Sequence, residues 1–310
     1  MLILGEKYTF TPLEIERLKK KFSNISTVCY AEQDPSKVIN NIKQILNSDR
    51  FTIIVLNTKA KVDDTIISFL TNLKYDKTYK HLKIYSIEHF LEKFLYKCYI
   101  PEDNTDLHYL DDIQPFTKWQ YFQKRVVDYF GIFWLYLFSF FVVQKCKKKI
   151  QQESPGPIYF KQDRVGINNE TFTCIKFRSM HEKTDYFNHY TQKDDPRIFP
   201  WGKVMRRRRY DELPQIKNIL KADMHLIGPR AEWDQLVENY EKEIPYYNQR
   251  HVVRPGITGW AQVMYRYGSD MDDTRQKLMY DLYYIKYWSI FLELQIVWKT
   301  ALVVLHRKGH

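Results

Sequence analysis

The stretch RRRRYDELPQ, residues 206–215, sets four consecutive arginines directly before two adjacent carboxylates, Asp211 and Glu212. Arginine side chains bind phosphate oxygens and neutralise the charge that develops on them during phosphoryl transfer. A carboxylate can attack phosphorus as a nucleophile, and it can also hold a Mg²⁺ ion. The spacing therefore favours a site for a phosphorylated substrate. A plainer alternative is a solvated basic turn before two acids that stabilise a helix N-terminus by only ~0.3–1 kcal/mol.

Pro214 follows the two acids and suits the first turn of a helix, where its missing N–H has no cost. We therefore expect Asp211 to cap or open a helix from Asp211 to Ala222. Adjacent helical residues point about 100° apart, so the two acids would serve different partners. Other basic residues join the site only if the fold brings them there, and the candidates are Lys161, Arg164, Lys176, Arg178 and Arg230.

The elements that must position these residues form a predicted α+β domain over residues 154–310. Residues 154–166 and 172–180 are expected to be two strands joined by the turn INNE, and 254–260 a loop rich in turn residues. The remaining apolar periodicity predicts helices over 232–241, 275–288 and 290–306.

A hydrophobic segment precedes this domain. Residues 129–143 carry no charge, whereas a spanning helix needs roughly 20 apolar residues. Lysine and arginine flank the segment on both sides, which favours the anionic, cytoplasmic face of a membrane. We therefore expect residues 124–153 to form a membrane-associated helix, embedded or re-entrant. A core helix between two domains is the alternative.

Residues 1–110 alternate short apolar runs with amphipathic stretches, which predicts a Rossmann-like α/β domain with a small parallel sheet. No GxGxxG follows any of its strands, so we expect a regulatory or assembly role rather than nucleotide binding. The polar, proline-containing residues 111–123 are expected to be a linker.

Composition limits the class of partner. The 310 residues suit two domains, and a net charge of +11 favours phosphate-rich substrates, anionic lipid or nucleic acid. No helix-turn-helix, zinc or RNP-like motif supports nucleic-acid binding. The four cysteines are widely separated, which predicts neither a zinc site nor a disulfide framework. The first ten residues lack the apolar core of a signal peptide.

Six motifs in order resemble those of the bacterial sugar transferase family, the monotopic phosphoglycosyl transferases that initiate surface-glycan assembly. The resemblance covers residues 124–310, and the N-terminal segment is similar to the cytosolic domain of larger members. The motifs are SPGPIYFKQDRVG, KFRSM, DPRI, RRYDELPQIKNILKADMHLIGPR, RHVVRPGITGWAQV and YDLYYIKYWS.

The resemblance implies a two-step reaction. Asp211 attacks the β-phosphate of a UDP-sugar, UMP leaves, and polyprenol phosphate then takes the sugar phosphate from the aspartate. Glu212 is implied to be a second catalytic residue and to hold Mg²⁺. The implied substrate-binding residues are Lys176, Arg178, Arg206, Arg207, Arg230 and Arg254. The implied location is the cytoplasmic face of the bacterial inner membrane, where anionic lipid would be a partner. Nucleic acid is not an expected partner, and a homo-oligomer is possible in the family.

The sequence departs from the family at the membrane helix. Members carry a Ser-Pro pair that breaks this helix and returns it to the same face, whereas Phe140 and Phe141 stand here. A shallow helix lying in the interface is therefore an alternative to a re-entrant one. A catalytically inactive relative that acts as a membrane-surface binding or scaffold protein is the second functional alternative.

Overall fold

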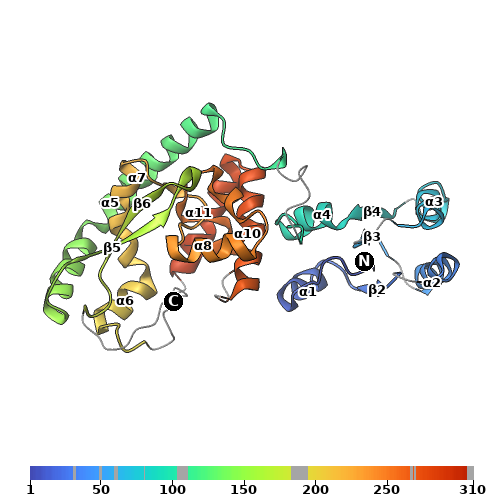
Figure 1. Ribbon diagram of the computed structural model, residues 1–310, viewed down its shortest axis with the longest axis horizontal. Helices are drawn as coiled ribbons and strands as arrows, with labels where there is room; N and C mark the ends of the chain where they lie inside the picture. The colour runs from blue at the N-terminus through green and yellow to red at the C-terminus, as the bar shows by residue number, and fades with distance from the viewer. Residues whose placement is uncertain are drawn as a thin grey trace. The chain divides into compact units, whose positions relative to one another are not determined.

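Two compact units make up the chain, Met1–Tyr99 and Ile100–His310 (Figure 1). The computed structural model describes residues 1–30, 33–48, 51–58, 62–79, 81–102, 111–182, 195–265, 268 and 270–305. The first unit ends at Tyr99, whereas we predicted an end at residue 110. The reason is that Arg275 in the second unit donates to the carbonyl oxygens of Ile100 and Pro101, both at 2.9 Å.

The first unit is built on a four-stranded parallel sheet in the order β2-β1-β3-β4. This confirms the predicted small parallel sheet. Its strands are β1 (Leu2–Leu4), β2 (Ser26–Val28), β3 (Ile53–Leu56) and β4 (Lys83–Ser86). Its helices are α1 (Pro12–Lys19), α2 (Pro35–Ser48), α3 (Asp64–Leu73), η1 (Lys77–Tyr79), α4 (Ile87–Phe90) and the π-helix η2 (Leu91–Leu95).

Apolar periodicity explains these elements. In α2, Val38, Ile42 and Leu46 recur every four residues and are buried, so one stripe of the helix packs on the sheet. The central strands β1 and β3 are apolar on both faces, as expected for a parallel sheet covered by helices.

Helix α5 (Lys118–Glu153) runs along the second unit as one continuous helix of 36 residues. It begins six residues before the predicted start at 124, because Thr117 and Gln120 form a capping box. The predicted linker 111–123 therefore belongs to the second unit. Asp112 in this segment pairs with Lys286 at 2.7 Å, and Ile113 is buried.

We expected an embedded or a re-entrant helix, and no turn interrupts α5, so the re-entrant geometry is not present. The physical reason is local: Phe140 and Phe141 each keep an N–H for the helical hydrogen-bond ladder, and neither has the ring that makes proline clash with the preceding turn.

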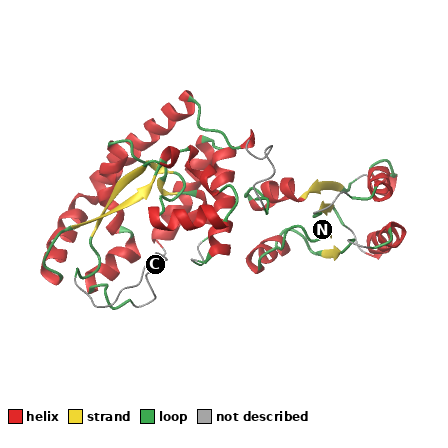
Figure 2. Ribbon diagram, viewed as in Figure 1, coloured by secondary structure: helices red, strands yellow, loops and turns green. Residues whose placement is uncertain are grey.

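The predicted hairpin is confirmed. Strands β5 (Tyr159–Val165) and β6 (Thr171–Phe177) pair antiparallel, with Tyr159 opposite Phe177 (Figure 2). The connecting turn contains η4 (Ile167–Asn169), in which Asn168 and Asn169 adopt φ of 55° and 60°. Asparagine tolerates this left-handed region better than most residues, which explains the turn.

The segment with the arginines and the acids differs from the prediction. Arg206, Arg207 and Arg208 end a helix, α6 (Pro200–Arg208), and Arg209 has a left-handed φ of 60°. The expected helix over 211–222 is a 3₁₀-helix, η5 (Tyr210–Gln215), followed by a short α7 (Ile216–Leu220). Pro214 inside η5 cannot donate a hydrogen bond, and Asp211 forms no helix cap.

A second correction concerns the RPGITGW stretch, which we expected to be a loop. It contains β8 (Gly256–Thr258), which pairs in parallel with β7 (His225–Ile227). Glycine permits this pairing, because a Cβ atom on Gly256 would lie 2.1 Å from the backbone nitrogen of Gly228.

Three predicted helices of the second unit are confirmed with shifted ends, namely α8 (Asp234–Glu243), α10 (Met271–Lys286) and α11 (Ile290–Leu305). The unit also contains η6 (Tyr247–Val252) and α9 (Trp260–Met264). One face of α5 packs against the elements that carry the acids. Cys146 and Ile150 contact a core with Phe177, Phe199 and Met205, and Ile132 packs with Ile219 and Met224.

Candidate active site

The two carboxylates lie side by side on η5 in different environments. Glu212 is buried, and its Oε1 atom faces three cations. These are Lys176 Nζ at 3.4 Å, Arg209 Nη1 at 3.5 Å and Arg230 Nη1 at 3.5 Å. Asp211 is half-buried, and its Oδ1 atom is buried without a hydrogen-bond partner among the described residues.

These surroundings push the pKa values of the two acids in opposite directions. Burial opposes ionisation of Glu212, but the charges of Lys176, Arg230 and Arg209 outweigh it and lower its pKa to about 2. Burial raises the pKa of Asp211, and the negative charge of Glu212 raises it further, against the cations nearby. Divergent pKa values in a pair of acids are typical of a division of labour in catalysis.

Five basic side chains surround the acids, and we name them the cationic cluster. They are Arg164, Lys176, Arg206, Arg209 and Arg230. Burial lowers the pKa of Lys176 and of Arg206, because the site brings these charges close together out of water. Glu232 lies 3.9 Å from Arg230, and Asp195 interacts electrostatically with Arg206. Five positive charges against these two acids together with Asp211 and Glu212 still leave a net positive site, which suits a diphosphate.

Four segments supply the cluster, and the first is β5, which carries Arg164. Lys176 comes from β6, and Arg206 and Arg209 come from the end of α6. Arg230 follows β7 and forms a bridge with Gly256, so the β7–β8 pairing fixes it beside Glu212. The left-handed turn at Arg209 ends α6 and starts η5, which places this side chain within reach of Glu212.

Asn218 is a positioning residue that we did not predict. Its Oδ1 accepts from the N–H of Ile175 at 3.1 Å, and its Nδ2 donates to the carbonyl of Thr173 at 2.8 Å. It thereby fixes the segment after the acids onto β6 next to Lys176. The signal in the sequence is a single buried polar residue in the apolar run IKNIL.

Three predicted substrate-binding residues lie elsewhere. Arg178 is buried and donates to Pro157 O at 2.6 Å and to Ser154, so it holds the α5–β5 connection rather than facing the acids. Arg207 is exposed on α6. Arg254 stacks on the ring of Tyr121, with 4.7 Å between the guanidinium carbon and the ring centroid.

The residues present fit a Mg²⁺ ion only together with a substrate. No group of three histidine, cysteine or acidic side chains converges among the described residues. Asp211 Oδ1 is a buried oxygen without a hydrogen-bond partner in the part of the chain that the structure describes, and Glu212 is ionised. Mg²⁺ is commonly held by one or two carboxylates plus substrate phosphates. The excess of positive charge in the site disfavours binding of Mg²⁺ by itself. A bound diphosphate would offset that charge and favour Mg²⁺ binding.

A large apolar surface lies on the same unit. Helix α5 is long and apolar enough to cross a membrane by length and composition, and only 17% of its most apolar window is buried. Large apolar side chains are exposed along it, including Trp119, Phe130, Phe138 and Phe141. Exposed aromatic residues at this density are unusual in contact with water.

Helix α11 also exposes apolar side chains. Among its described side chains, the exposed ones carry no charge, and they include Phe291, Leu294 and Trp298. Its buried Glu293 pairs with Lys124 of α5 and accepts from Trp288 Nε1 at 2.8 Å. The ion pair fixes α11 beside the first third of α5. We name the exposed apolar residues of the two helices the apolar face.

The sequence of the second unit matches known proteins. The sequence model described as "Bacterial sugar transferase" matches residues 119–307. A UDP-N-acetylgalactosamine-undecaprenyl-phosphate N-acetylgalactosaminephosphotransferase of Aeromonas hydrophila is 50% identical over 157 residues, which cover 50% of this chain and 37% of that protein. A UDP-glucose:undecaprenyl-phosphate glucose-1-phosphate transferase of Xanthomonas campestris pv. campestris is 42% identical over 163 residues, covering 51% and 34%.

A shorter relative is matched over most of its length. The uncharacterised sugar transferase EpsL of Bacillus subtilis (strain 168) is 33% identical over 190 residues, which cover 60% of this chain and 89% of that protein. The chain thus spans about a third of the two longer relatives.

Proposed function

Because the chain belongs to the bacterial sugar transferase family, we propose that it transfers a sugar 1-phosphate from a UDP-sugar to polyprenol phosphate. The relatives from Aeromonas and Xanthomonas are named for UDP-sugar donors and for undecaprenyl phosphate as the acceptor. The observation that carries the proposal is the pair of acids with divergent pKa values inside the cationic cluster.

Asp211 is the proposed nucleophile. Its Oδ1 atom has no hydrogen-bond partner among the described residues, whereas Glu212 is held by three cations and cannot approach a phosphorus atom without losing them. An oxygen of Asp211 forms a bond to the β-phosphorus, and the bond from that phosphorus to the bridging oxygen breaks. UMP leaves with the electron pair, and the sugar phosphate stays on the aspartate.

In the second half-reaction, an oxygen of polyprenol phosphate attacks the same phosphorus. The bond to Asp211 breaks, the carboxylate is restored, and polyprenyl diphosphate sugar is released. The raised pKa of Asp211 makes its carboxylate more basic, and therefore a better nucleophile, than an exposed aspartate. The product would start a surface polysaccharide or another glycoconjugate.

The cationic cluster is proposed to bind the diphosphate and to stabilise charge in the transition state. Arg164, Lys176, Arg206 and Arg230 were candidates from the sequence, and the structure adds Arg209 as a neighbour of the acids. Fixed charges in a site with little water stabilise developing oxyanions without reorganisation. When bound, Mg²⁺ would neutralise further phosphate charge, and Glu212 is the residue that would hold it together with the substrate.

The apolar face is proposed to bind the membrane that carries the lipid acceptor. An apolar helix flanked by lysines at 145 and 147–149 suits an anionic leaflet, which is the cytoplasmic face of the bacterial inner membrane. The unbroken α5 favours a helix that lies along the interface over one that re-enters. The first unit is proposed to regulate or assemble the enzyme.

A scaffold without activity is the second candidate, and the missing break in α5 is the observation that favours it. The two are separated by an assay of UMP release with undecaprenyl phosphate and a panel of UDP-sugars that includes UDP-glucose and UDP-N-acetylgalactosamine. We expect UMP from at least one donor, and none from the Asp211→Asn variant. Absence of UMP with every donor would support the scaffold.

A further inference from the structure

The position of Arg230 in the site depends largely on its backbone. Its guanidinium pairs with Glu212 at 3.5 Å and with Glu232 at 3.9 Å. Both distances exceed the ~2.7–3.2 Å of a good N–H···O hydrogen bond, so neither acid holds the side chain firmly. The backbone of residues 228–233, which the structure describes in full, follows an irregular path between β7 and α8. What holds this stretch therefore decides where the guanidinium lies.

Backbone pairing and two arginine side chains hold the stretch. The bridge between Arg230 and Gly256 pairs it with β8. Arg164 donates to the carbonyl oxygen of Ala231, and Arg250 Nη2 donates to the carbonyl oxygen of Arg230 itself at 2.7 Å. A hydrogen bond from an ionised donor is about twice as strong as one between neutral groups. The contact from Arg250 therefore fixes the backbone at the residue whose side chain serves the site.

Arg250 is buried, and its guanidinium is held at both ends. Nη2 also donates to Asp281 Oδ2 of α10 at 2.8 Å, and Nη1 donates to Tyr247 Oη at 2.8 Å. Burial raises the pKa of Asp281 to about 6, which still leaves the carboxylate ionised at pH 7. The planar fork of arginine allows one side chain to reach an acid, a phenol and a carbonyl together. A lysine in the same place could not keep all three contacts.

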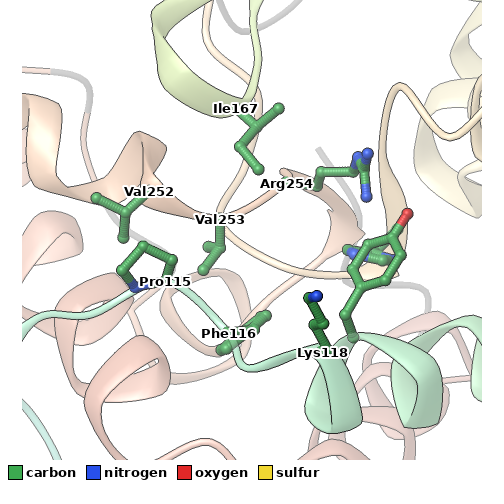
Figure 3. Close-up of a pocket in the computed structure, with 9 residues that line it drawn as sticks. Pro115, Phe116, Lys118, Ile167, Val252, Val253 and Arg254 are labelled. Atoms are coloured by element: carbon green, nitrogen blue, oxygen red, sulfur yellow. The ribbon is translucent and has the colours of Figure 1, made fainter.

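The element that carries Arg250 is anchored independently of the two acids. Arg250 lies in η6, and the next residue, His251, places its Nδ1 atom 2.5 Å from Asn169 Oδ1 in the hairpin turn. Figure 3 shows the chain as it leaves η6, where Val252 and Val253 line a pocket of ≈ 220 Å³ between the hairpin turn and the start of α5. Because η6 is tied to these neighbours, Arg250 can act as a fixed support.

We propose that Arg250, oriented by Asp281 and Tyr247, is a positioning residue that holds Arg230 in place for the diphosphate. It acts through the carbonyl oxygen of Arg230, and its own guanidinium is used by contacts within the protein. The effect on the backbone can be tested without substrate. Because Arg230 binds a diphosphate only in the proposed function, the effect on kinetics rests on that function.

The first test is hydrogen–deuterium exchange of the full chain at pH 7, read by mass spectrometry of peptides, which measures how firmly each segment is held. Arg250→Lys keeps a charge for Asp281 but lacks the fork that also reaches the carbonyl of Arg230. We expect residues 226–233 to exchange about tenfold faster in this variant, with the hairpin, residues 159–177, unchanged. Native exchange at 226–233, or equal acceleration throughout the second unit, would overturn the proposal.

Arg178→Lys is the matched control. Arg178 is also a buried arginine that donates to a carbonyl oxygen, that of Pro157 at 2.6 Å, but it holds the α5–β5 connection. This variant should leave the exchange of residues 226–233 at the native rate. If it accelerates that exchange as much as Arg250→Lys does, the effect is a general loosening, and the positioning role is wrong.

Tyr247→Phe replaces Arg250→Lys if the lysine variant does not fold. It removes the hydroxyl that accepts from Nη1 and leaves the ion pair with Asp281 intact. We expect the same local acceleration at residues 226–233, but only about threefold, because one of the contacts that orient the guanidinium is lost. Native exchange at 226–233 in this variant would count against the proposal in the same way.

The second test is a double-mutant cycle on UMP release, with undecaprenyl phosphate and a UDP-sugar that yields UMP in the panel above. Arg250→Lys should lower kcat/KM about tenfold in the native chain. In a chain that already carries Arg230→Gln, the same change should cost less than ~twofold, since no guanidinium is left to place. Equal losses in both chains would show a purely structural role and contradict the proposal. If the native chain releases no UMP, the proposed function fails, and the exchange measurement alone decides the role of Arg250.

Discussion

Lys176 on β6 and Glu212 on η5, 36 residues apart in the chain, bring Nζ and Oε1 to 3.4 Å in the buried part of the site. The contact ties the hairpin to the segment that carries Asp211. It also keeps Glu212 ionised, which raises the pKa of its neighbour Asp211. A structural pairing between strand and turn thus sets the basicity of the proposed nucleophile.

The first prediction concerns Glu212. Glu212→Gln removes the charge that would hold Mg²⁺ with the diphosphate and lowers the basicity of Asp211. We expect kcat/KM for UMP release to fall by ~10²–10³, the range seen when one preorganised electrostatic contact is lost. The Mg²⁺ concentration for half-maximal activity should rise. Glu232→Gln, which removes an acid that lies 3.9 Å from Arg230, is the control and should keep the Mg²⁺ requirement. An unchanged Mg²⁺ requirement in Glu212→Gln would show that this residue has another role.

Stability should depend on acid pH through Glu212. Its pKa is lowered in the folded state from 4.5 to about 2, so its ionised form stabilises the fold above pH ~4.5. That contribution is lost as the pH falls from ~4.5 towards 2. We expect urea unfolding to show a smaller loss of stability over this window in Glu212→Gln than in the native chain. Equal losses in both proteins would contradict the pKa assignment.

Asp211 should show the opposite sign. Its pKa is raised on folding, so its charge at pH 7 costs stability. Asp211→Asn should therefore raise the melting temperature by a few degrees, at ~2–4 °C per kcal/mol, while it abolishes turnover. Differential scanning calorimetry at pH 7 measures the shift. A melting temperature below that of the native protein would show that the carboxylate stabilises the fold.

Much of this arrangement follows from sequence patterns. Apolar alternation predicted the first unit and the β5–β6 hairpin, because period and turn residues are local properties. The segment after Arg206 was predicted less well. The left-handed residue Arg209 and the 3₁₀ turn around Pro214 depend on tertiary contacts with Lys176 and Arg230, which a linear pattern does not contain.

The separate positions of two neighbouring basic residues were also beyond prediction. The motif KFRSM contains two basic residues, and the structure separates them because Lys176 lies within β6, whereas Arg178 follows the end of the strand at Phe177. Lys176 faces Glu212, and Arg178 faces Ser154 and Pro157. The continuous α5 agrees with the absence of the family's Ser-Pro pair, since nothing at Phe140 or Phe141 interrupts a helix.

Membrane binding gives a further prediction. Phe291 and Trp298 are 83% and 66% exposed on α11. Phe291→Glu with Trp298→Glu should reduce binding to vesicles of anionic lipid at least tenfold, because two charges replace buried apolar area at the interface. Gln295→Glu, a single charge on the same helix, should have a smaller effect. Co-sedimentation with vesicles measures both, and full retention of the double variant would remove α11 from the apolar face.

The unbroken α5 predicts shallow attachment. A salt wash should release the native protein substantially, because lysine contacts with an anionic surface contribute roughly 1 kcal/mol each and are screened by salt. The variant Phe140→Ser with Phe141→Pro should need detergent, because it restores the break that allows a helix to re-enter. If the native protein resists salt as strongly as the variant, the attachment is deep and the shallow geometry is wrong.

The most direct measurement is the intact mass of the protein after mixing with a UDP-sugar and Mg²⁺ in the absence of polyprenol phosphate. We predict a mass increase equal to one sugar-phosphate group, located at Asp211 by peptide mapping, lost on addition of polyprenol phosphate and absent from Asp211→Asn. Release of UMP by the native protein without any covalent adduct, or an adduct that persists in Asp211→Asn, would contradict the account.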